Sequence, residues 1–204
     1  FSPTHFAGGR AAGELGGLVY RGDCREPAKM AYYADKLGEL SPQKPLRASG
    51  KISLHRGVSD SSVLIGFFDS RASTETNASQ ANGLPDSFLG ISTDAPSSEG
   101  FYFAPTYRFG GDYGHGANHS PPHLYPDGKT HDWTLVYSPT AGTDGEITAT
   151  LDGRKVRLPL GKGHRDASEK AKTRFDRFGI ITTWIDGNSQ TIYFDDLTYT
   201  VNQE

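Results

Sequence analysis

Short runs in which apolar and polar residues alternate recur along the whole chain, and Gly, Pro, Asp and Ser bound most of them. Alternation with a period of two is typical of strands that bury one face. The pattern predicts ten strands, at residues 17–20, 46–54, 62–68, 88–93, 100–107, 133–137, 146–151, 155–160, 178–185 and 191–201. Ten strands spread over the chain imply two packed sheets.

Two hairpins are clear in this pattern. In EITATLDGRKVRLPL, Asp152 and Gly153 are residues that tolerate the positive φ of a tight two-residue turn. This turn sets the register and predicts one shared face, formed by Ile147, Ala149 and Leu151 in the first strand and Val156, Leu158 and Leu160 in the second. In FGIITTWIDGNSQTIYFDDLTYT, a longer DGNSQ turn joins two strands of high β propensity.

Three segments lack the strand pattern. Residues 27–37 predict a short helix, because Met30, Tyr33 and Leu37 follow helical spacing. Residues 161–174 predict a loop with a turn of helix. Residues 110–133, GGDYGHGANHSPPHLYPDGKTHDW, hold four of the seven histidines among Gly and Pro, and predict a long connection between two strands.

Composition agrees with an all-β chain. Only 35% of the 204 residues are hydrophobic, whereas 25 are Gly and 12 are Pro, which suits strands joined by turns. This length predicts a single β-sandwich domain over residues 1–204. Since the sequence begins at Phe1 without Met or a recognisable leader, we expect a mature or excised piece of a longer protein.

Charge and hydropathy exclude several partners and constraints. The formal net charge is −3, so no basic field would attract nucleic acid. No run approaches eighteen apolar residues, so we expect no membrane insertion. Cys24 is the only cysteine, which excludes a disulfide within the chain.

The succession THDWTLVYSPT, GEITATLDGRKVRLPL and FDRFGIITTWIDGNSQTIYFDDLTYT resembles the second half of concanavalin A-like, or laminin G-like, jelly rolls. Those domains have a His-x-Trp strand, a hairpin ending in Leu-Asp-Gly, and an Asp pair in the last strand. The resemblance covers residues 130–201, and the first half matches only as a run of strands. It implies a two-sheet antiparallel β-sandwich, and is shared with domains inside large bacterial surface or secreted proteins.

The resemblance implies a carbohydrate ligand but no reaction, because the class includes lectins, carbohydrate-binding modules, glycoside hydrolases and polysaccharide lyases. Our main hypothesis is a noncatalytic, lectin-like domain of a larger secreted or cell-surface protein that binds a polysaccharide or glycan. Sugars are bound by aromatic faces and planar polar groups. The candidate ligand-binding residues are Tyr102, Tyr107, Arg108, Tyr113, His115, His119 and Trp184. Trp133 is expected in the core, whereas Trp184 fits a sugar platform or the core.

Two other classes of function stay open. A polysaccharide lyase needs a base and a group that neutralises a uronate carboxylate, for which Tyr107 or His115 with Arg108 are candidates. A retaining glycosidase of this fold resembles a Glu-x-Asp-x-x-Glu strand, which is absent here; an inverting pair from separate strands would escape this test. The third class is a structural or interaction domain.

The sequence offers candidates for two kinds of metal site, and no cofactor is required. His115, His119 and His123 recur every four residues, but the Gly and Pro between them prevent a helix that would align them on a transition metal. The resemblance implies a structural calcium ion instead, with Glu14 and Asp195 or Asp196 as candidate ligands. The alternative is that one of these Asp residues faces solvent while the other accepts backbone or Arg hydrogen bonds.

Overall fold

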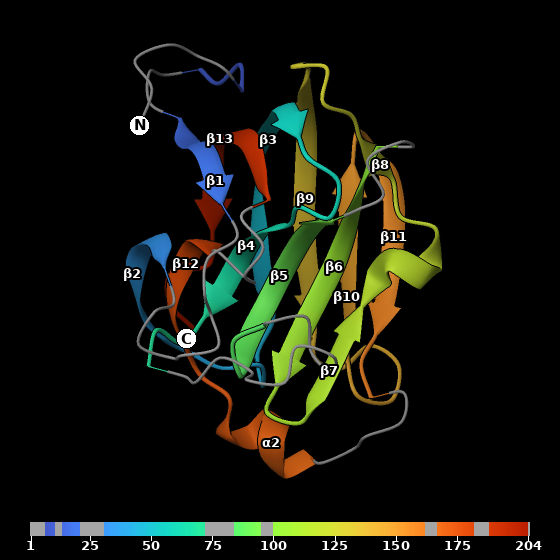
Figure 1. The fold of residues 1–204 in the computed structure, drawn as a ribbon. Helices are drawn as coiled ribbons and strands as arrows, with labels where there is room; N and C mark the ends of the chain where they lie inside the picture. Colours follow the sequence, from blue (N-terminus) through green and yellow to red (C-terminus); the bar gives the residue numbers. More distant parts are fainter. Residues whose placement is uncertain are drawn as a thin grey trace.

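A computed structural model describes residues 7–10, 14–20, 31–71, 84–94, 100–161, 167–181 and 188–203. In these residues two antiparallel sheets lie face to face (Figure 1). The six-stranded sheet has the order β1 (Leu15–Tyr20), β13 (Ser189–Tyr199), β3 (Leu46–Gly57), β9 (Thr130–Ser138), β10 (Glu146–Leu151) and β11 (Arg154–Pro159). The seven-stranded sheet has the order β2 (Tyr32–Leu40), β12 (Phe175–Ile181), β4 (Val63–Phe68), β5 (Ser87–Asp94), β6 (Phe101–Phe109) and β7 (Asp112–His115), with β8 (His123–Leu124) also paired to β6.

The predicted two-sheet antiparallel sandwich is confirmed. Each of the ten predicted strands corresponds to a strand, with ends that differ by a few residues; the one expected at 178–185 is described as far as Ile181. The turn of helix expected within residues 161–174 is α2 (Ala167–Lys172), at the bottom of the sandwich in Figure 1. No helix in the described residues is long and apolar enough to cross a membrane.

The hairpin of β10 and β11 has the predicted register. Asp152 and Gly153 have φ of 47° and 79°, the two positive values of a type I′ turn. Ile147 therefore pairs with Leu158, and Ala149 with Val156. All the residues predicted on this face are buried, so the turn residues correctly predict which side of the hairpin faces the core.

The helix predicted at residues 27–37 is wrong where the structure describes it, because residues 32–40 form strand β2. This strand pairs with β12 along its length, with one irregularity near Phe175. Leu37 and Leu40 are buried, whereas Tyr33, which the helix would have placed beside Leu37, is 68% exposed. Pairing with a neighbouring strand outweighs the local helical spacing.

The core lies between the sheets and is rich in aromatic rings. Trp133 is buried, as predicted, and its ring contacts Phe103 of the opposite sheet and Phe194 of its own sheet. At another point the buried side chain of Gln190 joins the sheets, because it donates to the carbonyls of Ser61 and Thr93 and accepts from the Thr93 hydroxyl. The two sheets are thus joined by packing and by buried hydrogen bonds.

Candidate ligand-binding face

Strand β6 separates a core face from an outer face. Phe101, Phe103 and Tyr107 point into the core. By alternation, Tyr102, Ala104, Thr106 and Arg108 point to the outer side of the seven-stranded sheet. Six residues separate Tyr102 from Arg108, so this outer row is about 20 Å long. The sequence predicted this row as the ligand side.

Strands β7 and β8 add residues to the same outer face. Gly110, with φ of 59°, turns the chain back so that His115 lies opposite Thr106 and Tyr113 opposite Arg108. At the other end of β6, β8 places His123 opposite Tyr102. Between these contacts the 3₁₀ helix η2 (Gly116–His119) approaches Pro105 at the edge of β6, where a residue without an N–H is tolerated.

Three aromatic side chains, Tyr102, His123 and Tyr125, form a group that we call the aromatic corner. The ring centroids of Tyr102 and His123 are 5.2 Å apart, and those of His123 and Tyr125 are 6.3 Å apart. Tyr125 is 51% exposed, so the group offers an open aromatic surface. Gly100 beside it has φ of 89°, and a Cβ there would lie 3.0 Å from the Cβ of His123. The corner therefore requires a glycine at this position.

His115 is held in a defined orientation. Its Nδ1 accepts a hydrogen bond of 3.2 Å from the N–H of Ala117 and so caps η2. The proton of the neutral ring is then on Nε2, which is buried and lies 3.9 Å from Oδ2 of Asp94. This nitrogen makes no hydrogen bond to any described residue. Burial lowers the pKa of His115, although the charge of Asp94 opposes this effect. The ring is therefore neutral near pH 7, and its Nε2–H is a donor near Asp94.

Arg108 is almost fully engaged by the protein. Its Nε donates to the carbonyl of Gly110 at 2.8 Å, its Nη1 donates to that of Leu84 at 2.9 Å, and its Nη2 lies 2.5 Å from Oδ1 of Asp86. The residue is only 6% exposed. The guanidinium thus holds the segment before β5, which contains Leu84 and Asp86, to the turn after β6, which contains Gly110. The carboxylate of Asp86 balances its charge.

Tyr107 lies in the core and does not share the outer face with Arg108. It is 2% exposed; its hydroxyl donates to Oδ1 of Asp112 at 3.0 Å and accepts from the N–H of Gly161 at 3.2 Å. Burial raises the pKa of its phenol well above the usual value. A ligand on the outer face cannot reach this side chain.

The remaining predicted residues are dispersed. Tyr113 and His119 are exposed, on β7 and η2, and Trp184 lies outside the described residues. The three histidines at four-residue spacing do not converge, since His115 caps η2 whereas His123 contacts Tyr102. Within the described ranges no group of three or more His, Cys, Asp or Glu side chains could hold a metal ion.

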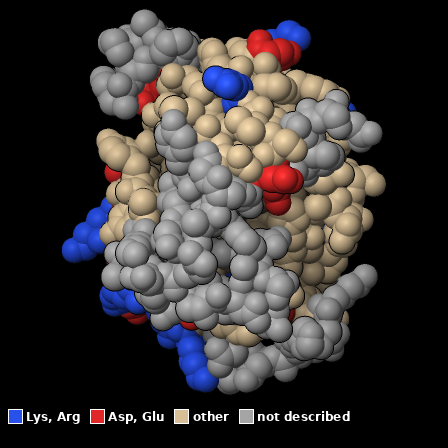
Figure 2. Space-filling view, viewed as in Figure 1, with Lys and Arg blue, Asp and Glu red and all other residues tan. Residues whose placement is uncertain are grey.

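Charged side chains are sparse on this side of the molecule. Figure 2 views it directly, and most of its described surface carries neither Lys or Arg nor Asp or Glu. Aromatic contacts and hydrogen bonds, more than net charge, are what this face can offer a ligand.

Comparison with known proteins shows a similarity of fold alone. No family model and no curated protein matches the chain. Among solved structures, alginate lyase Aly36B is similar with a TM-score of 0.55 and 11% identity over 95% of this chain and 83% of that one. A mutant of Aly36B in complex with an alginate tetrasaccharide is similar with a TM-score of 0.53 and 13% identity, over 95% and 82% of the two chains. The cellulose-induced protein Cip1 has a TM-score of 0.48 and 14% identity, over 95% and 81%.

The chain has a concanavalin A-like jelly-roll fold. Its aromatic corner was only partly predicted, because His123 and Tyr125 were assigned to a connection between strands. The segment His123-Leu-Tyr, with buried Leu124 between two less buried rings, alternates like a strand. Two residues of strand are too short a signal to separate from a loop.

In this jelly roll, Glu14 and Asp195 lie on adjacent strands. The register of β1 and β13, in which Leu15 pairs with Phe194, places Glu14 opposite Asp195 when it is continued by one residue. Glu14 is 1% exposed, and neither of its carboxylate oxygens has a hydrogen-bond partner among the residues that the structure describes. An unpaired buried carboxylate is costly, so this position fits a cation with oxygen ligands.

The two aspartates of the last strand have different roles. Oδ2 of Asp195 accepts a hydrogen bond of 2.7 Å from the N–H of Gly9, which lies directly against this carboxylate. Asp196 has φ of 48° and accepts from both the N–H and the Nε of Arg10. Asp195 thus lies opposite Glu14 on the adjacent strand, whereas Asp196 forms an ion pair with Arg10.

Proposed function

We propose that this jelly roll is a noncatalytic polysaccharide-binding domain of a larger secreted or surface protein. The observation that carries the proposal is the open aromatic corner at one end of the outer strip of β6, the row of Tyr102, Ala104, Thr106 and Arg108. Sugar rings present C–H faces that stack on aromatic rings, and hydroxyls that pair with planar polar groups. The aromatic corner offers the stacking surface, and Asp94, opposite Tyr102, offers a carboxylate. Ala104, Thr106 and Arg108, farther along the strip, are buried.

Each part of the strip has a role in this proposal. Tyr125, the most exposed ring of the aromatic corner, provides the stacking surface, with Tyr102 and His123 behind it. The carboxylate of Asp94, opposite Tyr102 on β5, accepts from a sugar hydroxyl, and the buried Nε2–H of His115 lies beside this carboxylate. Arg108 keeps the end of the strip in place through Asp86.

Binding without catalysis is favoured by the state of the two candidate bases. A lyase base must accept a proton at an exposed atom. The phenol of Tyr107 is in the core, and the basic Nδ1 of His115 already accepts from Ala117. Protonating His115 would break the cap of η2, so its ring is better suited to donating a hydrogen bond than to removing a proton.

Affinity electrophoresis in gels that contain neutral or uronate-rich polysaccharides tests the proposal. Tyr125→Ala should weaken retardation about fivefold, because it removes one exposed stacking ring. Tyr33→Ala is the matched control: it removes a tyrosine that is even more exposed, from β2, outside the strip. Retardation that is absent for every polysaccharide, or equal in Tyr125→Ala and the wild type, would refute the proposal.

A polysaccharide lyase is the second candidate, and the similarity of fold to alginate lyase Aly36B favours it. The base would then be a phenol other than Tyr107; Tyr113 is exposed and lies opposite Arg108. Incubation with polyuronates should produce the absorbance of unsaturated uronates, and Tyr113→Phe should abolish it. Retardation in gels without this absorbance leaves the binding function alone.

We also propose a structural calcium ion held by Glu14 and Asp195. The ion would neutralise two carboxylates and fix residues 7–10 against β13, with backbone oxygens and water completing its ligands. Calcium should raise the midpoint of thermal unfolding of the wild type, and a chelator should lower it. Glu14→Gln should remove this response. An unfolding midpoint that is indifferent to calcium in the wild type would exclude the ion.

A further inference from the structure

Four hydroxyl side chains form a row across the outer face of the six-stranded sheet, on the other side of the molecule from β6. Thr198 pairs with Ser49, Ser49 with Thr134, and Thr134 with Thr150, so the row crosses β13, β3, β9 and β10. Strands lie about 4.8 Å apart, which makes the row about 14 Å long. None of the four hydroxyls makes a hydrogen bond to another described residue.

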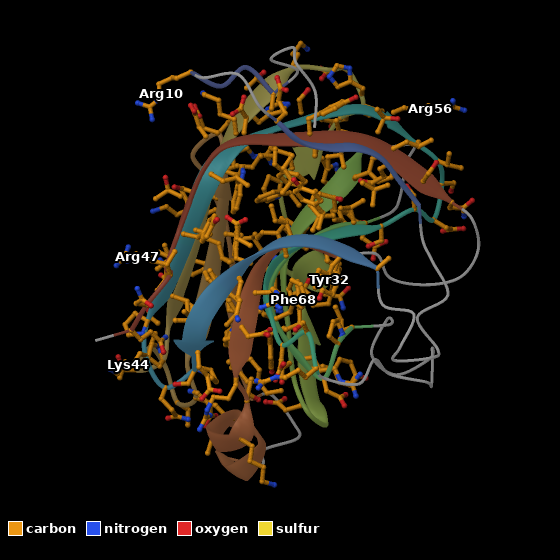
Figure 3. All side chains as sticks on the ribbon, turned by 90° about the vertical axis from the view of Figure 1, so that its left-hand side faces the viewer. Arg10, Tyr32, Lys44, Arg47, Arg56 and Phe68 are labelled. Carbon is orange, nitrogen blue, oxygen red and sulfur yellow. The ribbon has the colours of Figure 1, made fainter. Side chains whose placement is uncertain are left out.

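The neighbouring row carries an arginine at each end. Arg47 pairs with Val136, Val136 with Thr148, and Thr148 with Arg157. Arg157 is exposed and lies 3.9 Å from Glu146, and the Arg47 guanidinium has no ion-pair partner among the described residues. In Figure 3 the side chain of Arg47 extends from the sheet into solvent. Lys155, opposite Thr150, adds a third exposed cation.

A groove of about 420 Å³ lies over the part of the two rows that β13, β3 and β9 form. Its lining includes Arg47, Ser49, Thr134, Val136, Thr198 and Thr200. Tyr199 also lines it, but its ring stacks on Phe178 at 4.2 Å and its hydroxyl binds Asp35, so it offers no open aromatic face. The groove therefore combines hydroxyls with the guanidinium of Arg47 and has no stacking platform in its described lining, and the two rows continue beyond it to Thr150 and Arg157.

We infer that this groove is a second carbohydrate-binding site, and that its ligand is a polyuronate. We call it the hydroxyl face: Ser49, Thr134, Thr150 and Thr198 with Arg47 and Arg157. Serine and threonine hydroxyls both donate and accept, as sugar hydroxyls do. Guanidiniums pair with carboxylates through two parallel hydrogen bonds, so arginines at the ends of a row suit an acidic sugar chain.

The composition of the site favours a polyuronate over nucleic acid. Single-stranded nucleic acid is bound by aromatic platforms in a basic channel, and this groove has no such platform in its described lining. The chain has a net charge of −3, so it lacks the wide basic field that holds a phosphate backbone. Three local cations among hydroxyls instead match a chain with spaced carboxylates.

This inference goes beyond the proposed function, because the hydroxyl face and the strip on β6 belong to different sheets. A domain with both sites would bind two polysaccharide chains at once. Each site can also fail alone: the strip depends on the rings of the aromatic corner, and the hydroxyl face depends on Arg47 and Arg157.

The test measures retardation by a linear polyuronate in the Tyr125→Ala background, in which stacking at the strip is weakened. The double variant Arg47→Ala/Arg157→Ala should weaken the remaining affinity about tenfold and reduce its salt dependence. Arg56→Ala is the control, since Arg56 is an exposed arginine at the opposite end of the same strand (Figure 3). Thermal unfolding of each variant shows that these exposed substitutions leave the fold intact.

Nuclear magnetic resonance locates the site independently. Titration with polyuronate oligomers should shift the side-chain N–H signals of Arg47 and Arg157 and the amides of Ser49 and Thr134. The same sugars with carboxylates reduced to alcohols should shift them far less. The inference is refuted if only residues of the β6 strip shift, if Arg56→Ala weakens binding equally, or if a single-stranded oligonucleotide shifts the hydroxyl face as strongly.

Discussion

The hydroxyl of Tyr107 donates a hydrogen bond to Oδ1 of Asp112 over 3.0 Å, inside the sandwich. The oxygen of the Tyr107 hydroxyl also accepts a hydrogen bond from the N–H of Gly161, which comes shortly after strand β11 in the chain. One phenol thus joins the β6–β7 hairpin to the segment after β11. This relationship explains why an aromatic residue next to Arg108 is directed away from the outer face.

Tyr107→Phe should therefore act on stability and not on binding. It leaves Asp112 and the N–H of Gly161 without their partner, a loss of about 1–3 kcal/mol in the free energy of unfolding. Urea denaturation measures this loss, and affinity electrophoresis should give wild-type retardation at temperatures where the variant is folded. A variant of full stability that no longer binds polysaccharide would show that Tyr107 reaches the ligand.

His115 should make stability depend on pH in one direction. Burial lowers the pKa of its imidazole in the folded protein, whereas in the unfolded chain it stays near about 6.5. As the pH falls below that value, the unfolded chain binds the proton before the folded protein does, so protonation favours unfolding. The contribution of His115 to the free energy of unfolding is therefore complete above about pH 6.5 and is lost as the pH falls toward the pKa of the folded protein.

Urea midpoints of the wild type and His115→Gln at pH 7.5 and pH 5.5 measure this effect. The wild type should lose more stability between the two pH values than His115→Gln does. His119→Gln is the matched control, because His119 is exposed four residues away on η2. Equal pH dependence in the wild type and His115→Gln would contradict a lowered pKa for His115.

The strands and the hairpins were predictable because their signals are local. Asp152 and Gly153 determine a turn by their own backbone preferences, and the faces of β10 and β11 follow from it. Strand β2 was not predictable from Tyr33 and Leu37, since what makes it a strand is its pairing with β12, about 140 residues away.

The candidate site also combines features that the sequence predicts with features that it does not predict. Alternation in β6 correctly placed Tyr102 and Arg108 on one side and Phe103 on the other. That His123 joins Tyr102 depends on the register of a two-residue strand, and that Asp86 binds Arg108 depends on the pairing of β5 with β6. Such partners are set by tertiary structure and leave no periodic signal in the sequence.

Gln190 should be one of the most sensitive positions between the sheets. Its amide is fully buried; it donates to the carbonyls of Ser61 and Thr93 and accepts from the Thr93 hydroxyl. Gln190→Leu keeps the volume but leaves both carbonyls and the hydroxyl without their partner, so the free energy of unfolding should fall by about 2–4 kcal/mol. Urea denaturation measures this loss, and Ser189→Ala at the half-buried neighbouring position should stay near wild type. A loss as small as that of the control would mean that water replaces the amide.

Gly100→Ala should lower both the stability of the fold and the affinity for polysaccharide. Gly100 has φ of 89°, and its added Cβ would lie 3.0 Å from the Cβ of His123 and 3.1 Å from Cε1 of Tyr125. The substitution should cost about 1–2 kcal/mol of stability, because a side chain rarely adopts this φ, and should weaken polysaccharide binding, because the two rings must move.

Gly153→Ala is the control that separates the loss of stability from the loss of polysaccharide binding. Gly153 also has a positive φ, of 79°, but a Cβ there would meet no atom within 4 Å, and it lies in the β10–β11 turn, away from the aromatic corner. It should lose comparable stability and keep wild-type retardation in the polysaccharide gel. If Gly100→Ala binds as well as Gly153→Ala does at equal stability, the positions of His123 and Tyr125 do not govern affinity, and the aromatic corner is not the sugar platform.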